Sequence, residues 1–158
     1  MKKISILIII LLLISGTFFI KNKTPKVVPF KNSHNEDIRI PIIQKNINNE
    51  KVLFILDSGA NISILDSTWY YDNKHMFTEA ENINMVLTGI SGVVSINSKI
   101  IYTEIDEDYV VFTITDLIPV TQNLSKQGFK IVGILGSDYL KDNNLIIDYK
   151  KQAVYTAF

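Results

Sequence analysis

The chain has 158 residues, in which sixteen Lys and Arg balance sixteen Asp and Glu. This length allows one compact domain with a short appendage, and the balanced charge creates no overall field that would attract nucleic acid or acidic polymers. The sequence contains no cysteine, which excludes thiolate catalysis, disulfide bonds and any cysteine-based zinc site.

An uncharged apolar stretch, residues 4–20, lies near the start of the chain between lysines on both sides. As a helix it would be about 25 Å long, at the short end for crossing a bilayer. We expect residues 1–21 to be an uncleaved transmembrane anchor. A cleaved signal peptide is the alternative, but Ser15-Gly16-Thr17 is a poor match to the usual alanine-containing site. Because lysines flank both sides, charge orients the segment poorly. We expect the domain to lie outside the cytoplasm, and to be secreted if the segment is cleaved.

Residues 22–35 are rich in Lys, Asn, Pro and Thr and are predicted to form a tether, which leaves a domain over residues 36–158. This domain begins with two apolar runs around Asn48-Asn49, a pattern that predicts a β-hairpin leading to Asp57. A further short strand is predicted directly after Asp57-Ser58-Gly59-Ala60.

The central part of the domain is predicted to be mostly strand. Asp66 or Ser67 could cap one helical turn. Two strands are then expected to meet at Gly89-Ile90-Ser91-Gly92, because this composition is typical of a hairpin tip. Another apolar strand follows, and Pro119 is expected to end it.

The last thirty residues predict a strand, a short helix and a hairpin. The strand runs to Gly136, and Ser137 is the expected N-cap of a helix over residues 137–144 with Asp138 in its first turn. The chain closes with a hairpin around Lys150-Lys151-Gln152. Several short strands and a single helix argue for an all-β barrel or sandwich.

The triplet Asp57-Ser58-Gly59 is weak evidence by itself, because these residue types form turns in many proteins. Its context is more informative, since it directly follows an apolar strand and directly precedes Ala60 and another apolar strand. The pattern therefore places a carboxylate at the sharp end of a buried hairpin, where backbone amides can hold it.

Two patterns together resemble the retropepsin-like aspartic proteases, the single-domain relatives of pepsin. The first is "ILDSGA", with Ser63 a few residues on, and the second is "GILGSDYLKDNN" followed by "LIIDY". The resemblance covers about residues 38–155. It implies a retropepsin-like closed β-barrel with one short C-terminal helix, here preceded by an N-terminal transmembrane helix.

The resemblance also implies an aspartic endopeptidase that acts on peptide or protein substrates. In such enzymes two carboxylates share a proton and activate a water molecule. Because the chain supplies one motif, it implies a homodimer in which Asp57 of each subunit meets across a two-fold axis. The implied site consists of catalytic Asp57, supported by Ser58, Gly59 and Ala60, and a substrate-covering flap at Gly89, Ile90, Ser91 and Gly92. No metal and no organic cofactor is implied.

Other readings of the same residues remain open. The main alternative is a non-catalytic peptide- or protein-binding module on the same β-barrel fold, and a purely structural anchored module is a third. His34 and His75, the two histidines, are expected to be solvated loop residues, not metal ligands. The acidic run over residues 104–109 lacks the spacing of a calcium loop and is expected to be a solvated turn.

Overall fold

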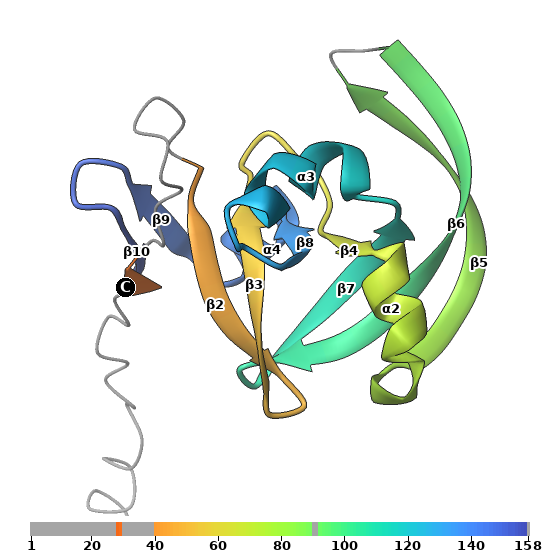
Figure 1. Cartoon of the computed structure of the whole chain (residues 1–158), viewed down its shortest axis with the longest axis horizontal. Helices are drawn as coiled ribbons and strands as arrows, with labels where there is room; N and C mark the ends of the chain where they lie inside the picture. The colour runs from red at the N-terminus through yellow and green to blue at the C-terminus, as the bar shows by residue number, and fades with distance from the viewer. Residues whose placement is uncertain (1–27, 30–39, 90–91, 158) are drawn as a thin grey trace, which may run out of the picture.

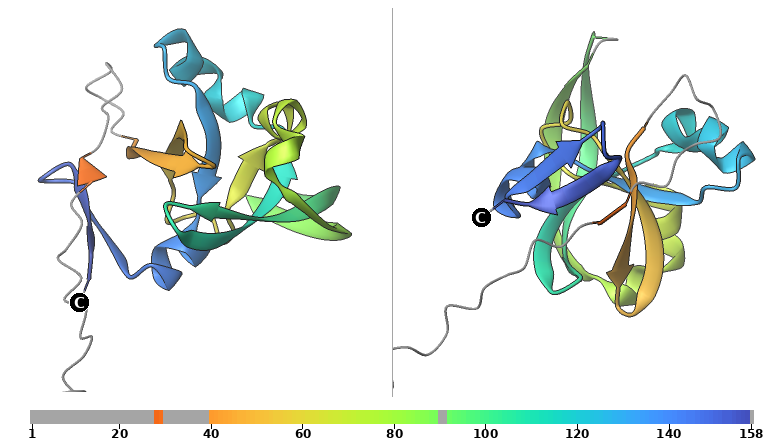
Figure 2. Two further views of the ribbon diagram at one scale, coloured as in Figure 1. Left: turned by 90° about the horizontal axis from the view of Figure 1, so that it is seen from below. Right: turned by 90° about the vertical axis from the view of Figure 1, so that its left-hand side faces the viewer.

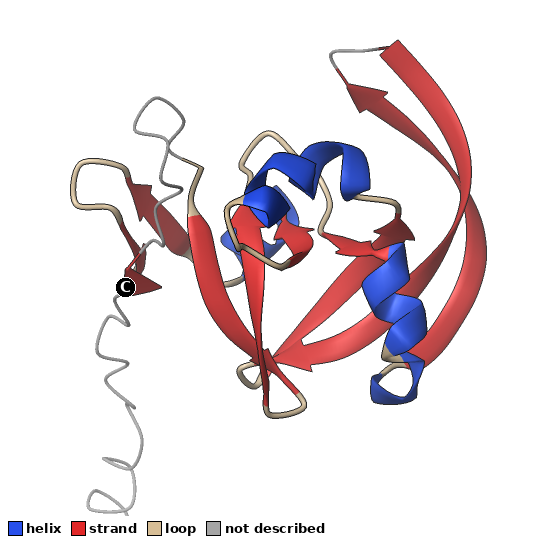
Figure 3. Ribbon diagram, viewed as in Figure 1, coloured by secondary structure: helices blue, strands red, loops and turns tan. Residues whose placement is uncertain are grey.

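The computed structural model describes residues 28–29, 40–89 and 92–157, which form a mostly β structure with a few short helices (Figures 1 and 3). The strands are β1 (Val28–Pro29), β2 (Ile42–Ile47), β3 (Glu50–Leu56), β4 (Ile64–Asp66), β5 (Thr78–Gly89), β6 (Gly92–Ile105), β7 (Asp108–Thr115), β8 (Ile131–Leu135), β9 (Leu145–Asp148) and β10 (Ala153–Thr156). The helices are α2 (Ser67–Asp72), the 3-10 turn η1 (Lys74–Met76), α3 (Ile118–Lys126) and α4 (Ser137–Asp142).

The predicted anchor, residues 1–21, lies outside these ranges. Among the helices of the described ranges, none is long and apolar enough to cross a membrane.

Seven strands form the main sheet, in the order β2-β3-β8-β4-β7-β6-β5. The predicted hairpin before Asp57 is confirmed as β2 and β3. Asn48 and Asn49 join them with φ angles of 47° and 67°. Two consecutive left-handed residues are what a two-residue hairpin turn requires, and asparagine tolerates this conformation well.

The closed barrel expected from the sequence is not found among the described strands, because the edge strands β2 and β5 do not pair. The sheet curls instead, as strand twist favours, and the turn between β6 and β7 reaches the end of β2. There Asp106 N donates to Asn46 O at 3.1 Å, and Lys45 Nζ lies 3.2 Å from Asp106 Oδ2. Beyond this contact β5 and β6 curve away on the side opposite β2 (Figure 1).

The curled sheet encloses an apolar core. Phe54 and Phe112 stack with their ring centroids 5.8 Å apart, and both are fully buried, as is Tyr70. Burying a side chain of this size stabilises the fold by about 1.5–3 kcal/mol. A second buried cluster lies beneath α3 and consists of Ile42, Ile55, Leu117, Leu124, Ile131 and Ile134.

The helices depart from the sequence-based expectation in two ways. The single-helix prediction is wrong, because α3 follows β7 and Pro119 does not end a strand. Pro119 lies in the first turn of α3, where its missing N–H costs no helical hydrogen bond. The N-cap of α4 is Gly136 and not Ser137, which is the first residue of the helix.

A second sheet has the order β1-β10-β9, and it lies beside the main body (Figure 2). The predicted closing hairpin is confirmed as β9 and β10. Strand β1 comes from the predicted tether, and Val28 and Pro29 pair with Val154 and Ala153. A proline is tolerated there because β1 is an edge strand.

Candidate active site

Asp57 is the first residue after β3, at the point where the chain leaves the sheet. Its neighbour Leu56 pairs with Leu135 of the parallel strand β8, and Asp57 N donates to Leu135 O at 3.0 Å. The backbone of Asp57 is therefore fixed by the sheet, while its side chain is exposed.

The following turn orients the Asp57 carboxylate. Gly59 N donates to Asp57 Oδ1 at 2.8 Å, and Ala60 N donates to Asp57 O at 3.1 Å. A Cβ atom on Gly59 would lie 3.1 Å from the same Oδ1, so glycine leaves room for the carboxylate to approach its amide. Ser58 is exposed, and Ala60 packs against the second apolar cluster.

The far end of this turn, at Ser63, is tied to the start of α4. Ser63 is fully buried and donates to Asp138 twice, from its N to Oδ2 at 2.7 Å and from its Oγ to Oδ1 at 2.8 Å. Gly136 N donates to Ser63 Oγ at 3.0 Å. The loop of residues 57–63 and the junction of β8 and α4 therefore hold each other in place.

Gly136 allows a close approach of two backbones at this junction. A Cβ atom there would lie 2.7 Å from the carbonyl of Ile62 and 2.8 Å from Ala60 O. The approach brings Ser137 N within 2.7 Å of Ala60 O, to which it donates a hydrogen bond.

The predicted flap residues lie at the end of the long hairpin of β5 and β6. Gly89 and Gly92 are its last paired residues, and Ile90 and Ser91 lie outside the described residues. The end of the hairpin and the loop after β3 both lie at the upper end of the molecule (Figure 1). Of the predicted site, the structure therefore describes the Asp57 loop and the flap residues Gly89 and Gly92.

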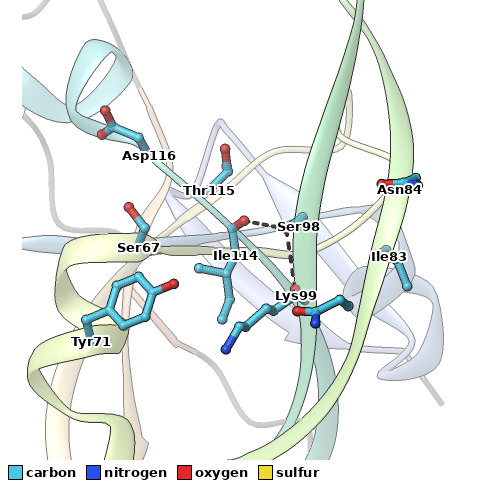
Figure 4. Close-up of a pocket in the computed structure, with 10 residues that line it drawn as sticks. Ser67, Tyr71, Ile83, Asn84, Ser98, Lys99, Ile114, Thr115 and Asp116 are labelled. Carbon is cyan, nitrogen blue, oxygen red and sulfur yellow. Dashed lines mark hydrogen bonds between the residues drawn. The ribbon is translucent and has the colours of Figure 1, made fainter.

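A cavity of about 710 Å³ lies between α2 and the lower part of this hairpin (Figure 4). Asp57 does not line it. The lining residues are Ser67, Tyr71, Asn82, Ile83, Asn84, Ser98, Lys99, Ile114, Thr115 and Asp116.

Two carboxylates near the site make long-range hydrogen bonds that the sequence did not predict. Asp138 was predicted only as a first-turn residue of the helix, and its bonds to Ser63 join segments distant in sequence. Asp66 accepts from Trp69 N at 2.9 Å as the N-cap of α2, and from Leu117 N at 3.1 Å. The sequence predicted either Asp66 or Ser67 as the cap of this helix. No local pattern predicted the hydrogen bond from Leu117 N to Asp66.

The described part of the chain holds no group of three or more His, Asp or Glu side chains that could bind a metal ion. His75 is exposed in η1, and His34 lies outside the described ranges.

Comparisons with known proteins give limited similarity. No protein-family model matches the chain, and no curated protein sequence matches it. A similar solved structure is that of EIAV protease complexed with the inhibitor HBY-793, at 21% identity and a TM-score of 0.45. The match covers 68% of this chain and 91% of that one.

Proposed function

We propose that the chain is a retropepsin-like aspartic endopeptidase with Asp57 as its catalytic residue. The observation that carries the proposal is the setting of this carboxylate. It is exposed at the end of a buried strand, oriented by Gly59 N at 2.8 Å, and placed on a loop that Asp138 holds through Ser63. A carboxylate needed only as a turn residue would gain little from this support.

The proposed reaction needs a second carboxylate, which we assign to Asp57 of another copy of the chain. One carboxylate takes a proton from a water molecule as the water attacks the peptide carbonyl, and the protonated partner donates to the carbonyl oxygen. The resulting diol then breaks its C–N bond as the first carboxyl group protonates the amide nitrogen and the second takes a proton from a diol hydroxyl, which releases the amine and the carboxylic acid and restores the pair. Two like charges at short range favour the state in which the pair shares one proton. A homodimer with a two-fold axis supplies this pair.

Neighbouring residues are given supporting roles in this proposal. The Ser58 hydroxyl would contact the backbone of the second copy, and Gly59 would permit the close approach of the two loops. Ala60, unlike a serine or threonine at that position, would donate no side-chain hydrogen bond to the carboxylate. The hairpin end at residues 89–92 would cover the bound peptide.

The proposal includes the N-terminal segment. Residues 1–21 would anchor the protein in a membrane, with the domain outside the cytoplasm, or would direct secretion if removed. Holding two copies in one membrane raises their effective concentration and so favours the dimer.

Cleavage of a mixed peptide library from about pH 4 to about pH 7 tests the proposal, because carboxylate dyads work on the acid side of neutrality. We expect cleavage by the wild type and by Asp142→Asn, whose side chain is exposed on α4. We expect none by Asp57→Asn, which keeps the side-chain shape and removes its titration. Equal cleavage by Asp57→Asn would contradict the proposal. A wild type that sedimented as a dimer but cleaved nothing would favour the non-catalytic binding module.

A further inference from the structure

The cavity beside α2 arises where strands β6 and β7 separate. Their last pair is Ile100 with Thr113, and β7 then continues to Thr115 by pairing with β4 instead. The next residues on the two strands, Ser98 and Lys99 on β6 and Ile114 and Thr115 on β7, therefore become opposite sides of an opening. We refer to this cavity, with the lining residues given above, as the groove.

A side chain links the two strands where they separate. Ser98 is buried, and its Oγ donates to Ile114 O across the opening. A hydroxyl group thus replaces the backbone ladder bond that a continuing pair of strands would have made. From this point β7 leads away from β6 towards Asp116 (Figure 4).

Two lining residues of the groove, Ser98 and Lys99, belong to a stretch of β6 that pairs with a strand on a single edge. Between Gly92 and Lys99, β6 pairs with β5, and within the described ranges no second strand pairs with β6 over this stretch. An edge of this kind presents backbone N–H and C=O groups in the register of an extended chain. An extended peptide can pair with such an edge as an added strand.

The walls of the groove suit a polar peptide segment. Asn82 and Asn84 line it from β5, and Ser67 and Tyr71 line it from α2. Their amide and hydroxyl groups can both donate and accept hydrogen bonds. Lys99 and Asp116 supply opposite charges, so the lining has no net charge that would select an ion. A volume of about 710 Å³ is within the usual range of binding sites, about 300–1,000 Å³.

The groove adjoins the Asp57 loop through two elements. Strand β4 leads from the loop of residues 57–63 directly into α2, which forms one wall. Asp116 lines the groove, and the next residue, Leu117, is buried in the cluster against which Ala60 packs. A residue that lines the groove is therefore the direct chain neighbour of a residue in the apolar cluster that supports the Asp57 loop.

We propose that the groove binds an extended, polar segment of the polypeptide substrate, away from the scissile bond, as an additional strand on β6. This inference rests on the proposed peptidase function and adds a substrate class to it. The preferred substrates are long, unfolded polypeptide segments, and short peptides that reach only the Asp57 loop are poorer substrates.

Two peptides with the same scissile sequence test this, one short and one extended on either side by polar residues. In the wild type we expect the long peptide to have the higher kcat/KM. Tyr71→Ala should lower that value on the order of tenfold, equivalent to about 1.4 kcal/mol, mainly through KM. Asn84→Ala, on the opposite wall, should act in the same direction. Neither variant should change cleavage of the short peptide.

Tyr109→Ala is the matched control, because Tyr109 is an 81% exposed tyrosine that does not line the groove. N-methyl groups on the backbone of the extension should also abolish the advantage of the long peptide, since they remove donors without changing side chains. Equal kcat/KM for the two peptides in the wild type would overturn the inference, as would equal losses on both peptides in Tyr71→Ala.

Binding separates this inference from the proposed catalysis. With Asp57→Asn, the long peptide should shift the NMR signals of the backbone amides of Ser98 and Lys99, which line the groove, and the short peptide should not. If these shifts occur but the wild type cleaves nothing, the peptidase proposal fails while the groove still binds peptide. If the wild type cleaves the long peptide without these shifts, the groove inference fails and the peptidase proposal stands.

Discussion

Asp138 binds Ser63 through two hydrogen bonds, although 75 residues separate them in the chain. One carboxylate oxygen accepts from Ser63 N at 2.7 Å, and the other accepts from Ser63 Oγ at 2.8 Å. The same hydroxyl accepts from Gly136 N. The loop that carries Asp57 and the start of α4 are therefore one structural unit, and the precision of the candidate site depends on both.

Replacing Ser63 by alanine should destabilise this unit. The change removes two hydrogen bonds at a fully buried position and leaves Gly136 N without its acceptor. A buried donor left unsatisfied costs about 1–3 kcal/mol. We expect a loss of this size in the free energy of unfolding, measured by urea denaturation. Ser125→Ala, on the exposed surface of α3, is the control and should change stability by less than about 0.5 kcal/mol. A Ser63→Ala variant as stable as this control would contradict the role of the contact.

Two glycines of the site should respond differently to alanine. In Gly136→Ala the new methyl group would meet backbone atoms of Ile62 and Ala60 at 2.7–2.8 Å, which cannot move without shifting the loop. We expect a loss of about 1–3 kcal/mol in the free energy of unfolding.

In Gly59→Ala the new methyl group would meet only Asp57 Oδ1, at 3.1 Å, and a side chain can rotate away. We expect a smaller loss of stability but a clear loss of peptidase activity, because the carboxylate leaves its amide donor. Chemical denaturation and a peptidase assay on both variants separate the two effects. Greater destabilisation by Gly59→Ala than by Gly136→Ala would show that the close contacts are not as described.

The contact between Lys45 and Asp106 should make stability depend on pH in acid. Burial alone would raise the pKa of Asp106, but hydrogen bonds from Asn46 and the charge of Lys45 outweigh it and hold the pKa below its usual value. Burial alone would lower the pKa of Lys45, but Tyr139 and Asp106 outweigh it and raise the pKa. The ionised pair therefore joins the turn between β6 and β7 to β2.

A carboxyl group with a lowered pKa in the folded state contributes stability above its unfolded pKa of about 4, and loses it as pH falls through the folded value. We expect Asp106→Asn to be less stable than the wild type at pH 7, and this difference to shrink below about pH 4. Urea denaturation at several pH values measures it, with Asp142→Asn as the surface control. A difference that did not change with pH would show that the charge of Asp106 is not what stabilises the turn.

Local patterns predicted much of the fold and of the Asp57 loop. Asn48-Asn49 indicated a hairpin because both residues tolerate positive φ, and the structure has that turn. The position of Asp57 at the end of an apolar strand, and a helix after Gly136, could also be read from neighbouring residues. Each of these features depends on interactions within a few residues of the chain.

Other features depend on contacts that no local pattern contains. Pro119 is compatible both with the end of a strand and with the first turn of a helix, and the burial of Leu124, on the inner side of α3, decides between them. The open sheet order and the separation of β6 from β7 are set by how distant strands pair. The groove follows from that pairing, which is why no binding site was predicted there from the sequence.

Asp66 is predicted to hold two walls of the groove together. Its Oδ1 accepts from Trp69 N in α2, and its Oδ2 accepts from Leu117 N, while its side chain is almost fully buried. Asparagine has one acceptor oxygen and an amide donor in place of the other, so Asp66→Asn can satisfy only one of these donors. We expect a loss of about 1–3 kcal/mol in the free energy of unfolding. We also expect a larger fall in kcat/KM for the long peptide than for the short one.

Asp72→Asn, at the exposed end of the same helix, is the control and should change neither the free energy of unfolding nor kcat/KM for either peptide. If Asp66→Asn lowered stability but reduced cleavage of both peptides equally, Asp66 would support the fold without positioning the groove.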